Sequence, residues 1–184
     1  MKYWTIQSQK VVQILEKEKV YYPKFALSQY YKQQHELYDF MLKSFNDNNN
    51  FTCEGLIYTF CASAKDTIFP IQNIDDFIYY IKKNKSKILC LWKYFLDNNC
   101  KILELETDLS FNDLAVSFND FQSIMSSKDN KISYGSDNYD IISNIRKGQI
   151  MSSGEDEDLI QAHLPYIKES NVVNIYELFT LDSI

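Results

Sequence analysis

Hydrophobic residues recur along the first quarter of the chain at spacings that predict a strand followed by helices. Residues 3–7 are rich in aromatic and β-branched side chains, which favours a strand. Val11, Ile14 and Leu15 then predict an amphipathic helix that Ser8 can cap. Apolar residues between positions 27 and 45 lie three or four apart, so the longest helix is expected over residues 26–45.

The rest of the chain alternates between helical and strand patterns. Residues 55–61 form a continuous apolar run typical of a central strand, and residues 62–73 are expected to be a connection. Residues 101–107 alternate apolar and charged side chains, which predicts a half-buried strand with Glu104 and Glu106 on its exposed face. Helices are expected at residues 75–83 and 87–96, with a strand as the alternative for 88–92, and further strands at 114–118, 160–166 and 172–179.

This order of elements predicts one α+β domain over residues 1–184, with a mixed or antiparallel split sheet and flanking helices. Polar stretches at residues 46–50, 126–137 and 148–158 are expected to be turns or loops.

Composition excludes several classes of protein. The chain has 184 residues, 45% of them hydrophobic, and a net charge of −6; Arg146 is its one arginine among 19 cations. Direct binding to nucleic acid is not expected, because arginine supplies most bidentate phosphate and base contacts. No apolar run approaches the roughly 18 residues of a membrane span, and no signal sequence is recognisable, so a cytoplasmic protein without membrane contact is expected.

Metal binding is not expected either. The four cysteines form no C-x-x-C pair and have no histidine nearby, which indicates reduced packing residues. The carboxylates of Glu104, Glu106, Asp108 and Asp113 would suit a two-metal nuclease only if they converged, and a solvated strand face explains them better.

Tyrosines occur in adjacent pairs at positions 21–22, 30–31 and 79–80. Neighbouring residues of a helix point about 100° apart, so such a pair can bury one ring and display the other. Displayed tyrosines are typical of protein-binding surfaces, while rings at the margin of the core are the alternative.

Three segments together resemble a bacterial protein family of unassigned function: W-T-I-Q at residues 4–7, LELETDLSFNDLAVSFNDF at 103–121 and IQAHLPYIKESNVVNIYELF at 160–179. The last segment is also similar to the closing hairpin of ADP-ribosyltransferases. The resemblance implies a split-sheet fold of that kind with NAD as cofactor. In those enzymes a glutamate binds a ribose hydroxyl of NAD and stabilises the positive charge that develops as nicotinamide leaves.

The resemblance assigns candidate residues to that chemistry. Gln161 and Ala162 match the Q-A-E motif, which places His163 where the glutamate would stand. Glu157, in the Glu155-Asp156-Glu157 run, is the alternative catalytic carboxylate, because it matches the E-x-E arrangement of the arginine-modifying branch. Thr5 or Gln7 would supply the first-strand polar side chain of the NAD site.

Histidine chemistry offers a second hypothesis for the site. Gln161 and His163 are two apart on a strand, so they are expected to point together toward a cleft or solvent. His35 and His163 could also form the acid–base pair of a metal-free ribonuclease with Lys168 holding the phosphate, although His35 reads more simply as a surface residue.

Two functions therefore stand side by side. The first is an NAD- or nucleotide-binding ADP-ribosyltransferase-like protein, active or degenerate, of a bacterial or phage conflict system. The second is a non-enzymatic inhibitor from a phage or mobile element, comparable to an anti-CRISPR protein. Its acidic, tyrosine-rich surface would bind a protein partner and cover a basic nucleic-acid-binding surface.

Overall fold

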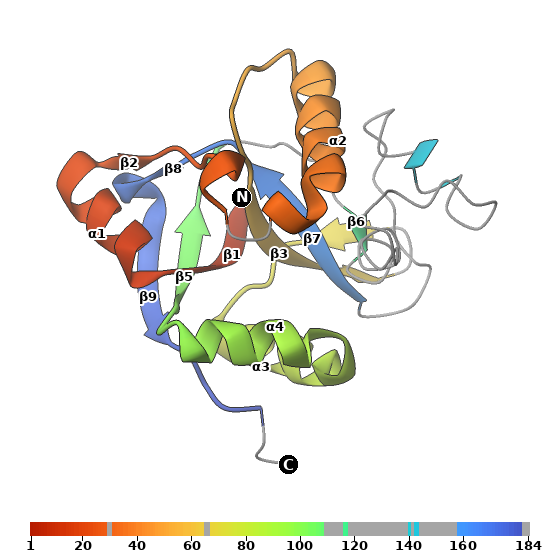
Figure 1. The fold of residues 1–184 in the computed structure, drawn as a ribbon. Helices are drawn as coiled ribbons and strands as arrows, with labels where there is room; N and C mark the ends of the chain where they lie inside the picture. The colour runs from red at the N-terminus through yellow and green to blue at the C-terminus, as the bar shows by residue number, and fades with distance from the viewer. Residues whose placement is uncertain are drawn as a thin grey trace.

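The computed structural model describes residues 1–28, 31–64, 67–108, 116–117, 140, 142–143 and 158–181. Its centre is a seven-stranded antiparallel sheet (Figure 1). The strands are β1 (Lys2–Gln7), β3 (Ile57–Ala64), β4 (Thr67–Phe69), β5 (Lys101–Glu106), β6 (Val116–Ser117), β7 (Asp158–Leu164) and β9 (Val172–Glu177). They follow the order β6-β7-β3-β1-β5-β9, and β4 pairs with β3. A separate two-stranded ladder joins β2 (Val20–Tyr21) to β8 (Ile167–Lys168).

Helices cover the sheet from several directions (Figure 1). The described helices are α1 (Gln9–Glu18), η1 (Phe25–Leu27), α2 (Tyr31–Asn49), α3 (Ile74–Lys83), α4 (Lys85–Asp97) and the short η4 (Glu169–Asn171). Helices α3 and α4 run in opposite directions below the sheet in this view, while α1 lies at the end that carries β2 and β8. The fold is therefore a mixed α+β arrangement, as the sequence predicts.

The strand register divides the sheet side chains between two buried faces. On one face, Trp4 lies opposite Phe60 of β3 and Glu104 of β5; we call this the Trp4 face. It packs against apolar side chains of α3 and α4, among them Phe77 and Trp92. Since both faces of the central strands are covered, the sheet lies at the middle of the core.

The opposite face, which we call the Tyr3 face, includes Tyr3 and Leu103 and packs against α1 and β8. The side chains that α1 and β8 contribute are Val11, Val12, Leu15 and Ile167. A third apolar cluster lies under α2, where Tyr38, Met41 and Phe45 pack with Phe25 of η1.

Several predicted elements are confirmed. Strands β1, β3, β5 and β7 occupy the expected regions, as do helices α1 and α3. The ambiguous apolar run at residues 88–92 belongs to helix α4, with Ile88 and Trp92 buried. The Ser8 side chain, however, makes no capping hydrogen bond, although Ser8 does stand at the N-cap of α1.

The helix expected over residues 26–45 is misplaced at both ends. Residues 25–27 form η1, and Leu27, expected on the buried side, is 83% exposed. At the other end α2 continues through Asn49, beyond the expected turn. Two asparagines in this region also bond to nearby backbone groups: Asn49 donates to the Phe45 carbonyl, and Asn46 both donates to and accepts from the Cys53 backbone.

The connection expected over residues 62–73 is also wrong in part. Strand β3 continues to Ala64, and Thr67–Phe69 forms β4, which folds back on β3 as a hairpin. Three residues are too few for a periodic pattern, which explains why β4 was not expected. Residues 126–137 and 148–157, expected to be loops, lie outside the described residues. Asp158, the last residue of the second expected loop, is instead the first residue of β7.

Among the described residues, no helix combines the length and apolar character needed to cross a membrane.

Candidate functional site

Gln161 and His163 lie on β7 and project from the same face of the sheet. The register places Gln161 opposite Phe60 and His163 opposite Tyr58 on β3, so both belong to the Trp4 face. Their common face is confirmed, but neither side chain points to solvent: Gln161 is 3% exposed and His163 is 0% exposed. The neighbours Ala162 and Leu164 are buried on the Tyr3 face. Strand β7 is therefore buried on both sides, which alternation alone did not predict.

His163 lies at the edge of an aromatic cluster that is centred on Tyr58. Its ring meets the Tyr58 ring edge-on, with centroids 5.0 Å apart. Tyr58 in turn contacts Phe25 and Tyr38, with ring centroids 6.2 and 6.0 Å apart. Burial raises the pKa of Tyr58 well above its usual value, and the nearby Tyr38 adds to the rise. The neutral phenol and the imidazole thus form part of an aromatic cluster between the sheet and α2.

Thr5 and Gln7 form a second pair on the Tyr3 face. The Thr5 hydroxyl donates to the Tyr58 carbonyl at 2.7 Å, and Gln7 Nε2 donates to the Thr5 hydroxyl at 2.9 Å. Thr5 is opposite Leu103 and fully buried. The structure therefore brings Thr5 together with Gln7, and Gln161 together with His163, but places the two pairs on opposite faces of the sheet.

The remaining candidates from the sequence do not join these pairs. Glu157 and its neighbours Glu155 and Asp156 lie outside the described residues. His35 is exposed on α2, where its ring contacts Tyr31 at 6.5 Å between centroids. Lys168 is exposed on β8, with its ammonium 5.6 Å from the centre of the Tyr166 ring.

The burial of Glu104 shows that the pattern predicted for β5 was wrong at this position. Glu104 was expected on an exposed face with Glu106, but it is 4% exposed, while Glu106 is exposed. One carboxylate oxygen pairs with the Lys2 ammonium at 2.7 Å. The other accepts hydrogen bonds from Asn174 Nδ2 at 2.8 Å and from the Tyr176 hydroxyl at 3.0 Å. The correction follows from the neighbours: β1 and β9 flank β5 and supply partners for a buried carboxylate.

This network also sets the ionisation of Glu104. Burial by itself would raise the pKa of the carboxyl group, but the hydrogen bonds from Lys2, Asn174 and Tyr176 and the positive charge of Lys2 lower it overall. Lys2 belongs to β1, and Asn174 and Tyr176 belong to β9, so the Glu104 carboxylate links β5 to both neighbouring strands. Its role is therefore structural.

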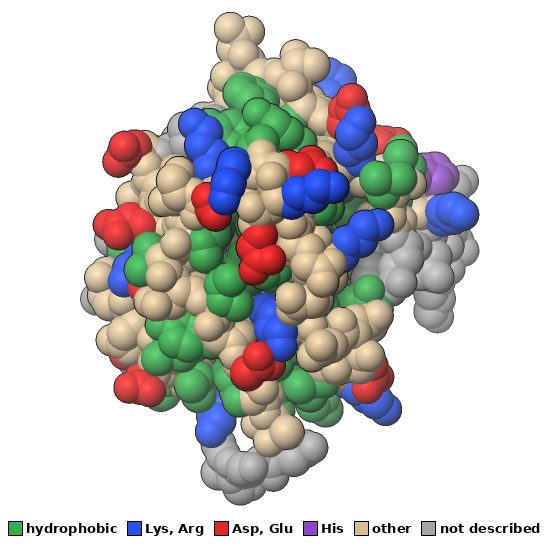
Figure 2. Space-filling model, turned by 90° about the vertical axis from the view of Figure 1, so that its left-hand side faces the viewer, with side chains coloured by type: hydrophobic (Ala, Val, Ile, Leu, Met, Phe, Trp, Pro, Cys, Tyr) green, Lys and Arg blue, Asp and Glu red, His purple; other side chains and the backbone are tan. Residues whose placement is uncertain are grey.

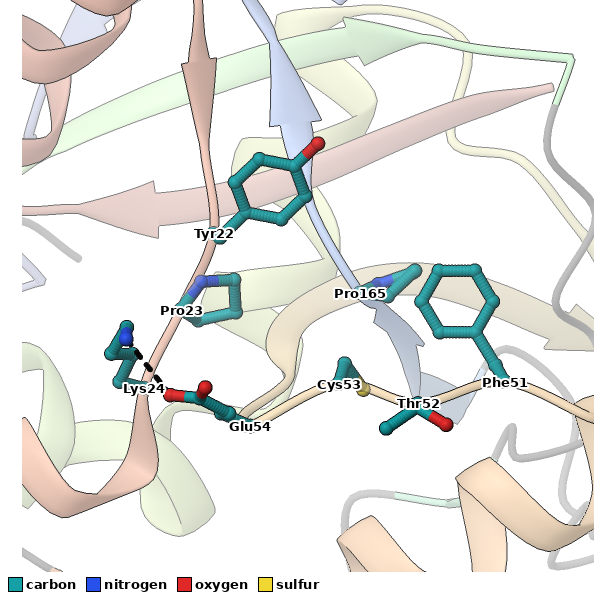
Figure 3. Close-up of a pocket in the computed structure, with 8 residues that line it drawn as sticks. All are labelled: Tyr22, Pro23, Lys24, Phe51, Thr52, Cys53, Glu54 and Pro165. Atoms are coloured by element: carbon teal, nitrogen blue, oxygen red, sulfur yellow. Dashed lines mark ion pairs between the residues drawn. The ribbon is translucent and has the colours of Figure 1, made fainter.

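A surface pocket of about 350 Å³ lies where three segments meet. Its lining residues are Tyr22, Pro23, Lys24, Phe51, Thr52, Cys53, Glu54 and Pro165. The rings of Tyr22 and Phe51 stand at opposite ends of it, with Pro165 between them and Pro23 next to Tyr22 (Figure 3). Tyr22 is 60% exposed, and an exposed ion pair of 2.9 Å joins Lys24 to Glu54 at the rim. Tyr22 belongs to one of the adjacent tyrosine pairs of the sequence, whereas Phe51 lies in a segment without a recognisable pattern.

Cys53 brings a thiol to this pocket. It is half-buried, and burial raises its pKa, although the Gly55 backbone partly offsets the effect. A thiol with a raised pKa is a poor nucleophile near neutral pH. The pocket is thus better suited to apolar contacts than to cysteine chemistry.

Gly55 fixes the wall of the pocket, because the backbone of residues 53–55 runs directly against residues 23–25. Phe25 N–H donates to the Glu54 carbonyl at 3.0 Å. A Cβ at position 55 would lie 2.8 Å from the Pro23 carbonyl oxygen and 2.9 Å from the Phe25 nitrogen. Both atoms belong to the backbone, so a side chain fits only if one segment moves.

We expect Gly55→Ala to lower the free energy of unfolding by about 1–3 kcal/mol, because overpacking must be relieved by a backbone shift. Urea unfolding should show a lower midpoint with an unchanged m-value. Thr52→Ala, an exposed position in the same segment, is the control and should change stability by less than about 0.5 kcal/mol. A Gly55→Ala protein as stable as wild type would contradict the close approach.

Among the described residues, no group of three or more His, Cys, Asp or Glu side chains is arranged to hold a metal ion. In comparisons with known proteins, no family model, no curated protein and no solved structure matches the chain.

Proposed function

We propose that the protein acts by binding another protein, as a non-enzymatic inhibitor that covers a basic, nucleic-acid-binding surface of a host defence complex. The observation that carries this proposal is the surface pocket between Tyr22 and Phe51. Exposed aromatic rings around a concave, apolar site are typical anchors of protein interfaces. Gln161 and His163, by contrast, are buried, which makes them less suited to meet a substrate.

The distribution of charge along the chain supports a partner with a basic surface. Residues 109–157 hold eight carboxylates and four cations, so they account for most of the net charge of −6. On the side of the molecule that carries α1 and β2, cations and carboxylates are interspersed (Figure 2). The pocket would therefore anchor the partner, and the acidic stretch would attract its basic surface. A phage or mobile-element inhibitor of this kind works inside the bacterial cell, in keeping with the cytoplasmic location expected from the sequence.

The test is partner capture with matched variants. Immobilised wild-type protein is exposed to nuclease-treated host lysate and compared with a Tyr22→Ser/Phe51→Ser variant. A Val173→Ser/Ile175→Ser variant is the control, because it also removes two exposed apolar side chains, at 48% and 47% exposure, outside the pocket. We expect wild type and control to retain the same partner and the pocket variant to lose it.

Duplex DNA and salt then test which surface of the partner is covered. If the partner's nucleic-acid-binding surface is occupied, excess DNA should displace the captured partner, and capture should weaken between about 50 and 200 mM salt. Equal capture by the pocket variant, or capture that neither DNA nor salt weakens, would refute the proposal.

A second candidate, the ADP-ribosyltransferase-like fold with NAD bound beside β7, is favoured by one observation. Gln161 Oε1 is buried and accepts no hydrogen bond from the described residues. A buried carbonyl oxygen without a donor is costly, and the carboxamide of nicotinamide could supply one. Gln161 and His163 would then line the NAD site, with Glu157 as the catalytic carboxylate. Thr5 and Gln7 would hold β1 in place from the opposite face of the sheet.

Thermal unfolding with NAD distinguishes this candidate from the first. NAD at about 100 times its dissociation constant should add roughly 2.7 kcal/mol of stability, which raises Tm by about 5–10 °C in a protein of this size. Gln161→Leu should remove that shift if the amide binds the ligand. No shift for wild type with NAD, ADP-ribose or mononucleotides would exclude the NAD site and leave the binding proposal untouched.

A further inference from the structure

Helices α3 and α4 form a hairpin whose two ends carry opposite charge. One residue, Asn84, joins the helices, which run in opposite directions (Figure 1). Four lysines surround this junction, which we call the basic tip: Lys82, Lys83, Lys85 and Lys87. Asp75, Asp76 and Asp97 lie at the other end, where α3 begins and α4 ends; we call this the acidic base. Lys93 lies one turn before Asp97 on α4, but the three carboxylates outnumber this cation, so the hairpin is an electrostatic dipole along its length.

These charges do not all serve the helices that carry them. In α3, aspartates in the first turn and lysines in the last turn agree with the helix macrodipole. In α4 the order is reversed, with Lys85 in the first turn and Asp97 in the last, and both positions are disfavoured by the macrodipole. The α4 charges therefore extend the polarity of the hairpin at some cost to α4 itself.

The two ends are also too far apart to stabilise each other. At 1.5 Å per residue, the 10 residues of α3 and the 13 of α4 separate tip from base by about 15–20 Å, roughly twice the Debye length at physiological salt. Lys82 and Lys85 at the tip, and Asp75 and Asp97 at the base, form no ion pair with any residue that the structure describes.

Apolar side chains lie between the charged ends on the outer surface of the hairpin. Asp75, Tyr79 and Lys83 are spaced four apart and exposed, so they follow one stripe of α3 with the ring in the middle. On α4, Leu89 and Leu96 are 44% and 37% exposed, and Tyr79 is 51% exposed. Tyr79 is the exposed member of its tyrosine pair, since Tyr80 is only 9% exposed.

We propose that this hairpin is a dimerisation surface and that its occupant is a second copy of the same chain. A two-fold axis across the hairpins sets each basic tip against the acidic base of the other copy and covers Tyr79, Leu89 and Leu96 of both. The same patch serves both subunits, because its charge pattern is complementary to itself. This proposal goes beyond the proposed function, since none of the pocket residues belongs to α3 or α4.

Charge reversal at one end tests the surface. We expect sedimentation velocity to show a wild-type dimer that dissociates more readily as salt rises. Lys82→Glu/Lys83→Glu/Lys85→Glu changes the charge of the basic tip from +4 to −2, so both ends become acidic. Asp75→Lys/Asp97→Lys changes the charge of the acidic base from −3 to +1, so both ends become basic. Each variant alone should therefore be monomeric. Lys10→Glu/Lys17→Glu/Lys32→Glu, three exposed lysines on α1 and α2, is the matched control and should still dimerise.

Mixing the two hairpin variants gives the decisive measurement. Their ends are complementary, so an equimolar mixture should form a heterodimer although neither variant pairs with itself. Tyr79→Ser/Leu89→Ser keeps the charges, removes the apolar centre and should weaken the dimer by at least roughly tenfold. A wild-type monomer at every concentration, a dimer that survives both reversals, or a mixture that stays monomeric would overturn the proposal.

Discussion

Trp4→Ala should lower the free energy of unfolding by about 3–5 kcal/mol, the largest effect that we expect of any single substitution in this chain. Trp4 is fully buried on the central strand β1. Its ring stacks on Phe77 of α3, with centroids 5.0 Å apart, and on Tyr176 of β9, with centroids 5.9 Å apart. Its Nε1–H donates to the Ile71 carbonyl at 2.9 Å. Truncation would thus open a cavity and leave a buried carbonyl without its donor.

Urea unfolding followed by circular dichroism measures this loss, and Trp92 remains as a fluorescent reporter. A drop of this size corresponds to roughly 10 °C in Tm. Trp4→Phe retains an aromatic ring but not the indole donor, so its loss should fall between wild type and Trp4→Ala. If Trp4→Ala cost less than about 1 kcal/mol, the ring could not be packed between α3 and β9 as described.

Glu104→Gln should be the second most damaging change, at about 2 kcal/mol near neutral pH. The substitution keeps the size of the side chain but removes the charge that pairs with Lys2. It also places an amide donor where Lys2, Asn174 and Tyr176 already donate. Glu106→Gln on the same strand and the same face is the control, because Glu106 is exposed and should contribute less than about 0.5 kcal/mol.

The pH dependence of this effect has a definite sign. The pKa of Glu104 is lower in the folded protein than the value of about 4.3 usual for an unfolded chain. The carboxylate therefore stabilises the fold fully above that unfolded value, and its contribution is lost as pH falls through the lower folded pKa. The stability difference between wild type and Glu104→Gln should shrink below about pH 4. A difference that stays constant or grows on acidification would rule out the charged network.

The spacing of apolar and polar residues was enough to predict an element where that spacing alone determines the local structure. Adjacent tyrosines can place one ring in the core and the other on the surface, and Tyr80 and Tyr79 are arranged in this way. The helical spacing of residues 75–83 was enough to place α3, because its buried stripe is continuous. The α+β class followed from such elements without knowledge of their contacts.

Other features depend on contacts that a single sequence does not contain. Alternation in β5 predicts which residues share a face, but not that Lys2 and Tyr176 would enclose Glu104. The same reasoning placed Gln161 and His163 correctly on one face but could not tell that both side chains would be buried. Phe51 entered the pocket unforeseen because residues 51–54 have no periodic pattern, and Glu157 lies outside the described residues.

The strand order has a consequence for how the protein is made. The chain's first strand lies at the centre of the sheet, and its neighbours are synthesised later: Trp4 lies opposite Phe60 of β3 and opposite Glu104 of β5, which is 104 − 4 = 100 residues further along the chain. At about 5–20 residues per second, a ribosome needs roughly 5–20 s to supply such a partner. During that interval the aromatic rings of β1 remain uncovered. Because the sheet contains many strand pairings between residues far apart in the sequence, we also expect slow folding. The nascent chain should therefore depend on chaperones until its last strand emerges.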